Sequence, residues 1–302
     1  AAEDKLKEVL KEEGFEFEVK PYCLFAGTRP GVNVLVYEKG PKVVVQGKGT
    51  EDFVTMKLEP LVLEKAELGY EEVHHPEWFV PHIGVDESGK GDFFGPLVVA
   101  GVHLAEGAAR RLMDEGVMDS KKISGDKRIS TLATLIREMP GVTMEVVSVG
   151  PEKYNQLYGK FRNLNRLLAW GHATVLENLL TRVPECTLAV SDQFANPAVL
   201  KRALKEKGRA IELVQRTKAE SDPAVAAASI IARDRFVKWL EETGRRAGID
   251  LPKGVSEGVK SAARQIVRQR GEAALSLVAK MHFRTAAEVL GRKPVEEVTD
   301  GE

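Results

Sequence analysis

Two adjacent carboxylates, Asp86 and Glu87, stand in the segment "IGVDESGKGDFFGPLVVAGV" at residues 83–102. They follow an apolar run that is typical of a strand, and a lysine between glycines, Lys90, comes soon after them. Neighbouring carboxylates repel each other, and a multivalent cation would offset that repulsion. An Asp-Glu pair is usually a solvated turn, but apolar flanks on both sides are typical of central strands. We therefore interpret Asp86 and Glu87 as candidate metal ligands at a strand end.

The same segment has a second interpretation, because "GVDESGK" matches the start of a nucleotide-binding phosphate loop. Gly91 stands where such loops have Ser or Thr, and acids inside the loop would repel phosphates. The residues after the lysine are typical of a strand, whereas a phosphate loop opens a helix. We reject this interpretation. The glycine-rich backbone at Gly89, Lys90 and Gly91 is instead expected to approach a ligand closely.

Three further acids stand where they could complete a metal site: Asp192, Glu220 and Asp222. Asp192 ends an apolar run, and the other two precede an alanine-rich helical run. Each could equally be a helix cap. Four carboxylates would neutralise two Mg²⁺ ions, the arrangement that phosphodiester hydrolysis commonly uses. Oxygen ligands alone favour Mg²⁺ or Mn²⁺ over zinc.

Basic clusters recur in the same part of the chain: "DSKKISGDKR", "GKFRNLNR", "QRTK" and "ARDRFVK". A charge run is usually a solvated helix face, so each cluster alone carries little weight. "DSKK" differs, because it is a polar turn before a helix and is well placed to hold a phosphate backbone. His172 and His282 stand in apolar stretches and are expected to have structural roles rather than catalytic ones.

The elements that would position these residues begin near residue 82. Apolar runs predict three strands, then strands and helices in alternation, then helices at 222–246, 256–270 and 271–290. This order predicts a mixed sheet flanked by helices, an α/β fold. Residues 5–14 predict a helix, and five short runs up to "FVTMKLEPL" predict an antiparallel sheet that ends near residue 68. Residues 69–81 predict a linker.

The whole chain has 302 residues, of which 43% are hydrophobic and 29% charged, so it can bury a sizeable core. A formal net charge of -1 is unusual for a nucleic-acid-binding protein unless a nest of carboxylates offsets basic patches. Two distant cysteines make a structural zinc site or disulfide framework unexpected. The N-terminal pattern is typical of a charged helix rather than a signal peptide. We expect a cytoplasmic protein that has no membrane partner.

Seven blocks together resemble the type 2 ribonucleases H, and among them the ribonuclease HIII group. They follow one another in the family's order from about residue 80 to 290: "GVDESGKGDFFGPLVVAGV", "DSKKIS", "NLNRLLAWGHA", "SDQF", "AAASIIARDRF", "LPKG" and "KMHF". The resemblance implies a ribonuclease H-like catalytic domain over 82–302, with C-terminal helices. It also implies that residues 1–68 form a small α+β domain, similar to the TATA-box-binding protein, that grips the substrate.

The activity that this resemblance implies is endonucleolytic cleavage of RNA in RNA/DNA hybrids by a monomer, leaving 5′-phosphate and 3′-hydroxyl ends. It implies Asp86, Glu87, Asp192 and Glu220 as catalytic ligands of two Mg²⁺ or Mn²⁺ ions, with Asp222 as the alternative fourth acid. Matched by motif, Gly89, Lys90 and Gly91 would read ribose 2′-hydroxyls, and Lys121 would contact phosphate. The alternatives are ribonuclease HII-like incision at single ribonucleotides in DNA, and a non-catalytic hybrid-binding module.

Overall fold

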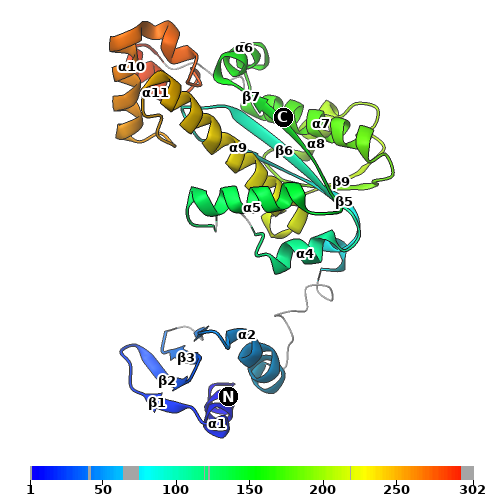
Figure 1. Cartoon of the computed structure of the whole chain (residues 1–302), viewed down its shortest axis with the longest axis vertical. Coiled ribbons are helices and arrows are strands. Elements are labelled where there is room, and N and C mark those ends of the chain that lie inside the picture. The colour runs from blue at the N-terminus through cyan, green and yellow to red at the C-terminus, as the bar shows by residue number, and fades with distance from the viewer. Residues whose placement is uncertain are drawn as a thin grey trace. The chain divides into compact units, whose positions relative to one another are not determined.

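The chain forms two compact units, Ala1–Glu77 and Trp78–Glu302, in the computed structural model (Figure 1). The structure describes residues 2–39, 42–63, 75–118, 120–121, 123–217 and 219–293. The division between the units falls inside the segment 69–81 that the sequence predicts as a linker, of which 69–74 lie outside the described residues.

The first unit is a helix packed on an antiparallel sheet of four strands in the order β1-β2-β3-β4. Its elements are α1 (Ala2–Glu12), β1 (Glu16–Glu18), β2 (Cys23–Arg29), β3 (Val32–Tyr37) and β4 (Lys42–Gln46). Leu6, Val9 and Leu10 recur at helical spacing, and their burial against Val34 and Val36 fixes α1 on the sheet. The predicted helix followed by a sheet is confirmed.

The last of the five predicted strands in this unit is wrong. "FVTMKLEPL" is helical and belongs to α2 (Thr50–Phe53) and the π-helix η1 (Val54–Leu63). Its alternating apolar residues suggest a strand, but the buried ones are Phe53, Leu58 and Val62, which recur every four or five residues. One helical face can therefore bury all three in the core that α1 shares.

The second unit contains the predicted mixed sheet, whose five strands have the order β7-β6-β5-β8-β9. The strands are β5 (His82–Ser88), β6 (Leu97–Leu104), β7 (Val142–Val149), β8 (Leu188–Asp192) and β9 (Glu212–Arg216). β5 pairs antiparallel with β6 and parallel with β8, and β8 pairs parallel with β9. The central strand β5 thus carries Asp86 and Glu87.

Helices cover both faces of this sheet (Figure 1). One face packs on α9 (Pro223–Ala247) and α5 (Asp126–Glu138), the other on α7 (Leu164–Arg182) and α8 (Pro197–Ala203). α9 crosses β5 at Gly84, where a Cβ atom would lie 2.2 Å from the Ala224 backbone. The shorter helices are η2 (Pro76–Trp78), α4 (Ala108–Asp114), α6 (Pro151–Phe161) and η3 (Ala219–Ser221).

The C-terminal helices differ from their predicted bounds. α10 (Glu257–Ser276) continues through a break at Gly271, whose φ is +80°, and α11 runs from Arg284 to Leu290. Residues 277–283, between the two helices, are not helical because their backbone forms hydrogen bonds with the turn after β5. Ala279 forms a β-bridge with Phe94, and Lys280 N donates to the Phe93 carbonyl oxygen. Within the described residues, no helix is both long and apolar enough to cross a membrane.

Candidate active site

Asp86 and Glu87 face opposite sides of the sheet, because side chains alternate along a strand. Asp86 faces α9, where the hydroxyl of Ser229 donates to its carboxylate. Glu87 faces α7, where His172 Nε2 donates to Oε2 over 2.9 Å. β5 runs on to Ser88, so the chain does not yet turn at the acid pair. The two acids share one end of the strand but have different surroundings.

The pKa of Asp86 is raised to about 7, mainly because burial disfavours its charged form and also because Glu87 is negative. The hydrogen bond from Ser229 and the positive charge of Lys121 oppose this rise only in part. Burial acts on Glu87 in the same direction, but His172 and the ammonium of Lys90, 3.5 Å from Oε1, outweigh it and lower its pKa. The groups that favour the charged form of Asp86 are therefore too weak to offset its burial.

Asp192 is the last residue of β8, beside Asp86. Val85 pairs with Ser191 in the parallel register, so the next residues on the two strands are Asp86 and Asp192. The Ser191 hydroxyl lies 3.2 Å from His172 Nδ1 on the α7 side, and alternation turns Asp192 to the α9 side. Two carboxylates from separate strands thus share one face at one end of the sheet.

Glu220 lies in η3, the single turn that precedes α9, and its side chain is half-buried. The preceding residue, Ala219, donates its backbone N–H to Asp192 Oδ1 over 3.4 Å. This contact holds the turn that carries Glu220 against the end of β8.

Asp222 has a structural environment, because donors surround its buried carboxylate. It caps α9, with Oδ1 accepting from the backbone N–H groups of Ala224 and Val225 at 2.9 and 3.2 Å. The same oxygen lies 2.9 Å from His82 Nε2, and Oδ2 accepts from Arg216 over 3.4 Å. Both oxygens are thus engaged by protein donors.

The turn from Gly89 to Gly91 follows these acids, with Gly89 buried and Gly91 exposed. Gly89 has a φ of +85°, and a Cβ atom there would lie 2.2 Å from the Pro96 carbonyl oxygen, so only glycine fits. A Cβ atom at Gly91 would meet nothing within 4 Å, which leaves the backbone open to a ligand. Lys90 lies between them with its ammonium near Glu87.

The C-terminal segment holds this turn from the protein interior. Lys280 is fully buried, and its Nζ donates to the carbonyl oxygens of Asp92 and Phe94 over 2.8 and 3.3 Å. The Asp92 carboxylate in turn accepts from the backbone N–H of Gly254 over 2.7 Å. Hydrogen bonds with Lys280 and Gly254 therefore fix the glycine-rich turn at two points beyond its own strand.

The "DSKK" turn reaches the site through α9. Ser120 is buried, and its hydroxyl lies 2.7 Å from that of Ser229, the residue that contacts Asp86. Lys121 is exposed, and its charge lowers the pKa of Asp86 in part. Lys122 lies outside the described residues. The exposed lysine is thus close enough to act on a ligand at Asp86.

The donor set fits a hard divalent cation, since every candidate ligand is a carboxylate. The raised pKa of Asp86 supports this fit, because a nearby cation would keep the group ionised at neutral pH. Among the described residues, no group of three or more His, Cys, Asp or Glu side chains lies close enough to hold a metal ion. The structure brings Asp86 and Asp192 to one face, with Glu220 in the adjoining turn, and places Glu87 on the other.

Comparisons with known proteins identify the family. The family model described as Ribonuclease HII matches residues 83–286. The chain is 42% identical over 289 residues to ribonuclease HIII of Protochlamydia amoebophila (strain UWE25), across 96% of this chain and 94% of that protein. It is 41% identical over 295 residues to ribonuclease HIII of Chlamydia pneumoniae, across 97% and 96%. The chain belongs to the ribonuclease HIII family.

The resemblance inferred from the seven sequence blocks is thereby confirmed, and the chain is a ribonuclease H enzyme. The solved structure of Bst-RNase HIII in complex with Mn²⁺ matches it with a TM-score of 0.68 and 30% identity, over 95% of each chain. This match extends over both units and confirms the fold predicted for ribonuclease HIII, including the small N-terminal sheet domain.

Two residues at the site were not predicted to have a role there. His172 is buried as expected, but its ring bridges Glu87 and Ser191 rather than packing only against apolar neighbours. Ser229 is the polar residue in the alanine-rich start of α9, and it contacts both Asp86 and Ser120. The available signal was a polar side chain inside a largely apolar helical run.

Proposed function

We propose that this ribonuclease HIII hydrolyses the RNA strand of RNA/DNA hybrids as an endonuclease and leaves 5′-phosphate and 3′-hydroxyl ends. One observation carries the proposal: Asp86 and Asp192 lie side by side on parallel strands, next to the open glycine backbone of the following turn. Acids and a phosphate-bearing ligand repel each other, so this combination requires cations between them.

In this proposal Asp86, Glu87, Asp192 and Glu220 would hold two Mg²⁺ or Mn²⁺ ions. Such a pair supplies an activated water and stabilises the leaving oxygen. Glu220 is preferred to Asp222 as the fourth acid because protein donors already engage both oxygens of Asp222. Glu87 would join through Oε1, which lies 3.5 Å from the ammonium of the partly exposed Lys90.

The glycine turn gives the substrate preference in this proposal. The 2′-hydroxyl distinguishes RNA from DNA, and backbone groups at Gly89, Lys90 and Gly91 would bond to it. Lys121 is exposed beside the acids and would contact a backbone phosphate. Residues 1–68 would grip the same substrate as a separate domain. We further propose that the enzyme acts as a cytoplasmic monomer.

Labelled substrates test this function directly. RNA/DNA hybrid, duplex DNA, duplex RNA and a DNA duplex with one ribonucleotide are each incubated with Mg²⁺, with Mn²⁺ and with EDTA. We expect cleavage of the hybrid alone, only with metal, and products that a ligase requiring 5′-phosphate can join. Preferred cutting at the single ribonucleotide would indicate ribonuclease HII-like incision. Hybrid binding without any cleavage would indicate a non-catalytic module.

A further inference from the structure

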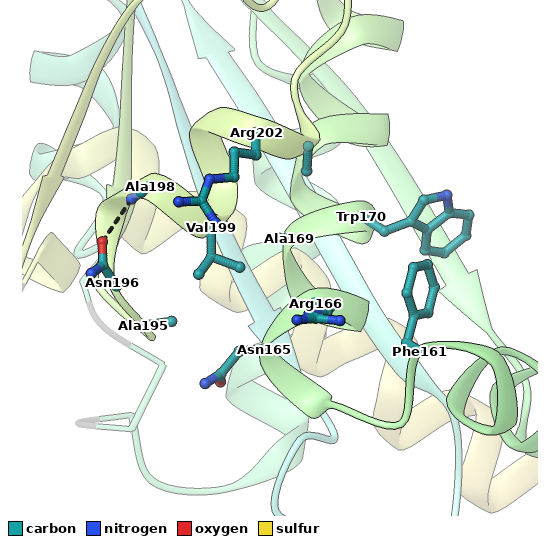
Figure 2. Close-up of a pocket in the computed structure, with 11 residues that line it drawn as sticks. Phe161, Asn165, Arg166, Ala169, Trp170, Ala195, Asn196, Ala198, Val199 and Arg202 are labelled. Carbon is teal, nitrogen blue, oxygen red and sulfur yellow. Dashed lines mark hydrogen bonds between the residues drawn. The ribbon is translucent and has the colours of Figure 1, made fainter. Parts of the chain in front are cut away.

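A cavity of about 680 Å³ lies between α7 and α8, on the side of the sheet opposite α9 (Figure 2). Phe161 and Trp170 lie next to each other on one side of it, and Val199 and Arg202 project from α8 on the other. Arg166 of α7 completes the lining on the aromatic side. Its volume is within the roughly 300–1,000 Å³ that is typical of small-ligand sites.

The side chains of this cavity suit a ligand that is planar at one end and anionic at the other. Aromatic rings such as Trp170 and Phe161 stack on nucleobases without sequence preference. Guanidinium groups such as Arg166 and Arg202 match phosphate oxygens in a two-pronged geometry. None of the described residues that line the cavity is an Asp or a Glu. A ligand that carries both a base and a phosphate is a nucleotide, which is the ligand class that this lining fits.

The cavity lies on the face of the sheet opposite Asp86 and Asp192, but some of its lining residues are close in the chain to the end of the sheet that carries these acids. Ala195 lines it and follows Asp192 by three residues, so their Cα atoms are at most about 11 Å apart. On the other wall, Trp170 precedes by two residues the His172 that donates to Glu87. A nucleic acid bound at the acids therefore brings its neighbouring nucleotides within reach of the cavity.

We propose that this cavity is a subsite for one unpaired nucleotide of the substrate, next to the hybrid segment. The base stacks on Trp170 and Phe161, and its phosphate pairs with Arg166 and Arg202. A base inside a duplex cannot enter a cavity between two helices, because its faces are already stacked on its neighbours. The enzyme would thus favour hybrids that adjoin a single strand. The proposal rests on the proposed function in taking a hybrid as substrate, but it does not depend on cleavage.

The test measures binding by fluorescence anisotropy in EDTA, where no cleavage interferes. The probes are a blunt RNA/DNA hybrid and the same hybrid with a short unpaired extension of RNA or of DNA. In the unmodified protein, we expect an extension to tighten binding about tenfold, the scale of one stacked base. The two extended probes show which strand supplies the nucleotide.

The variants are Trp170→Leu and Arg202→Gln, with Arg268→Gln as a control that removes an exposed charge from α10. We expect both cavity variants to lose most of the gain from the extension and to keep their affinity for the blunt hybrid, whereas the control keeps both. Arg202 is exposed, so Arg202→Gln tests the subsite even where Trp170→Leu disturbs folding.

Three results would overturn the subsite: no gain from either extension in the unmodified protein, a full gain in both cavity variants, or an equal loss for blunt and extended probes. The last would place these residues on the duplex. A protein that never cleaves a hybrid but keeps a gain that depends on Trp170 and Arg202 would refute the proposed function and leave the subsite standing.

Discussion

His82 Nε2 lies 2.9 Å from Asp222 Oδ1, and both side chains are fully buried. The other ring nitrogen, Nδ1, lies 2.7 Å from the carbonyl oxygen of Val80. Because both neighbours are acceptors, both ring nitrogens donate, as in the charged imidazolium. Burial alone would lower the pKa of His82, but the hydrogen bond and charge of Asp222 outweigh it and raise the pKa. Asp222 is therefore half of a buried ion pair that ties the start of β5 to the start of α9.

This ion pair gives Asp222 a structural role and so distinguishes it from Glu220, two residues earlier in the chain. We expect Glu220→Gln to fold normally and to cleave hybrids at least about a hundredfold more slowly, since even residues that only support metal ligands contribute roughly 10–100-fold. We expect Asp222→Asn to lower the free energy of unfolding by about 3–5 kcal/mol, because it removes one partner of the buried His82–Asp222 ion pair. Urea denaturation and single-turnover cleavage measure the two effects.

The opposite pattern would reassign the fourth ligand. An Asp222→Asn protein that unfolds at the same urea concentration as the unmodified one, yet does not cleave, would make Asp222 the ligand. Glu220→Gln would then be expected to cleave at the normal rate.

Asp192 gives a second prediction, because it is the carboxylate that the sheet places beside Asp86. Asp192→Asn keeps the shape of the side chain and removes its charge. We expect hybrid affinity in EDTA to stay within about twofold, and the single-turnover rate with Mg²⁺ to fall at least about a hundredfold. Asp250→Asn, at an exposed carboxylate far along the chain, is the matched control. Cleavage by Asp192→Asn at the unmodified rate would remove Asp192 from the site.

The placement of Asp86 and Asp192 in the candidate site could be predicted because each comes at the end of an apolar run. The apolar stretches before Asp86 and before Asp192 are both strands of the central sheet, and their parallel pairing brings the ends together. The side of the sheet that Glu87 faces could not be predicted. We expected the strand to end at the acid pair, but β5 continues to Ser88. The alternation of side chains then sends the two adjacent acids to opposite faces.

The contacts that support the acids could not be predicted from local pattern. Glu87 and His172 are 85 residues apart, and Ser120 and Ser229 are 109 apart, so only the folded sheet brings each pair together. The strand predicted at 53–61 failed for a related reason. Its alternation is compatible with a strand, and only packing against α1 selects the helical arrangement.

Lys280 gives a prediction about stability and pH. Burial lowers its pKa from 10.5 to about 7. Between these values the unfolded chain holds a proton that the folded protein does not, so the free energy of unfolding rises with pH across this range. We expect a rise of about 1–3 kcal/mol between pH 7 and pH 9 that is absent in Lys280→Met. Urea denaturation at several pH values measures both proteins, and parallel curves would contradict the prediction.

Lys280→Met should also affect catalysis, because the side-chain nitrogen of Lys280 donates to the carbonyl oxygens of Asp92 and Phe94. We expect the loosened turn to lower kcat for hybrid cleavage by roughly 10–100-fold while the variant remains folded at pH 7. Lys260→Met on α10 is the control, since it removes an ammonium that pairs only with exposed carboxylates among the described residues. An unchanged kcat would show that the turn keeps its shape without this lysine.

The small N-terminal unit gives the last prediction. Trp78–Glu302 has its own core on both faces of the sheet, so a chain that lacks residues 1–77 should fold. A second binding unit on the same chain raises affinity through effective concentration, and we expect its removal to raise KM by about tenfold or more with kcat retained. The shortened chain would also contact fewer phosphates, so its affinity for the hybrid should depend less steeply on salt. Steady-state kinetics at two salt concentrations measure both effects. An unchanged KM with an unchanged salt slope would mean that the small unit does not hold the hybrid.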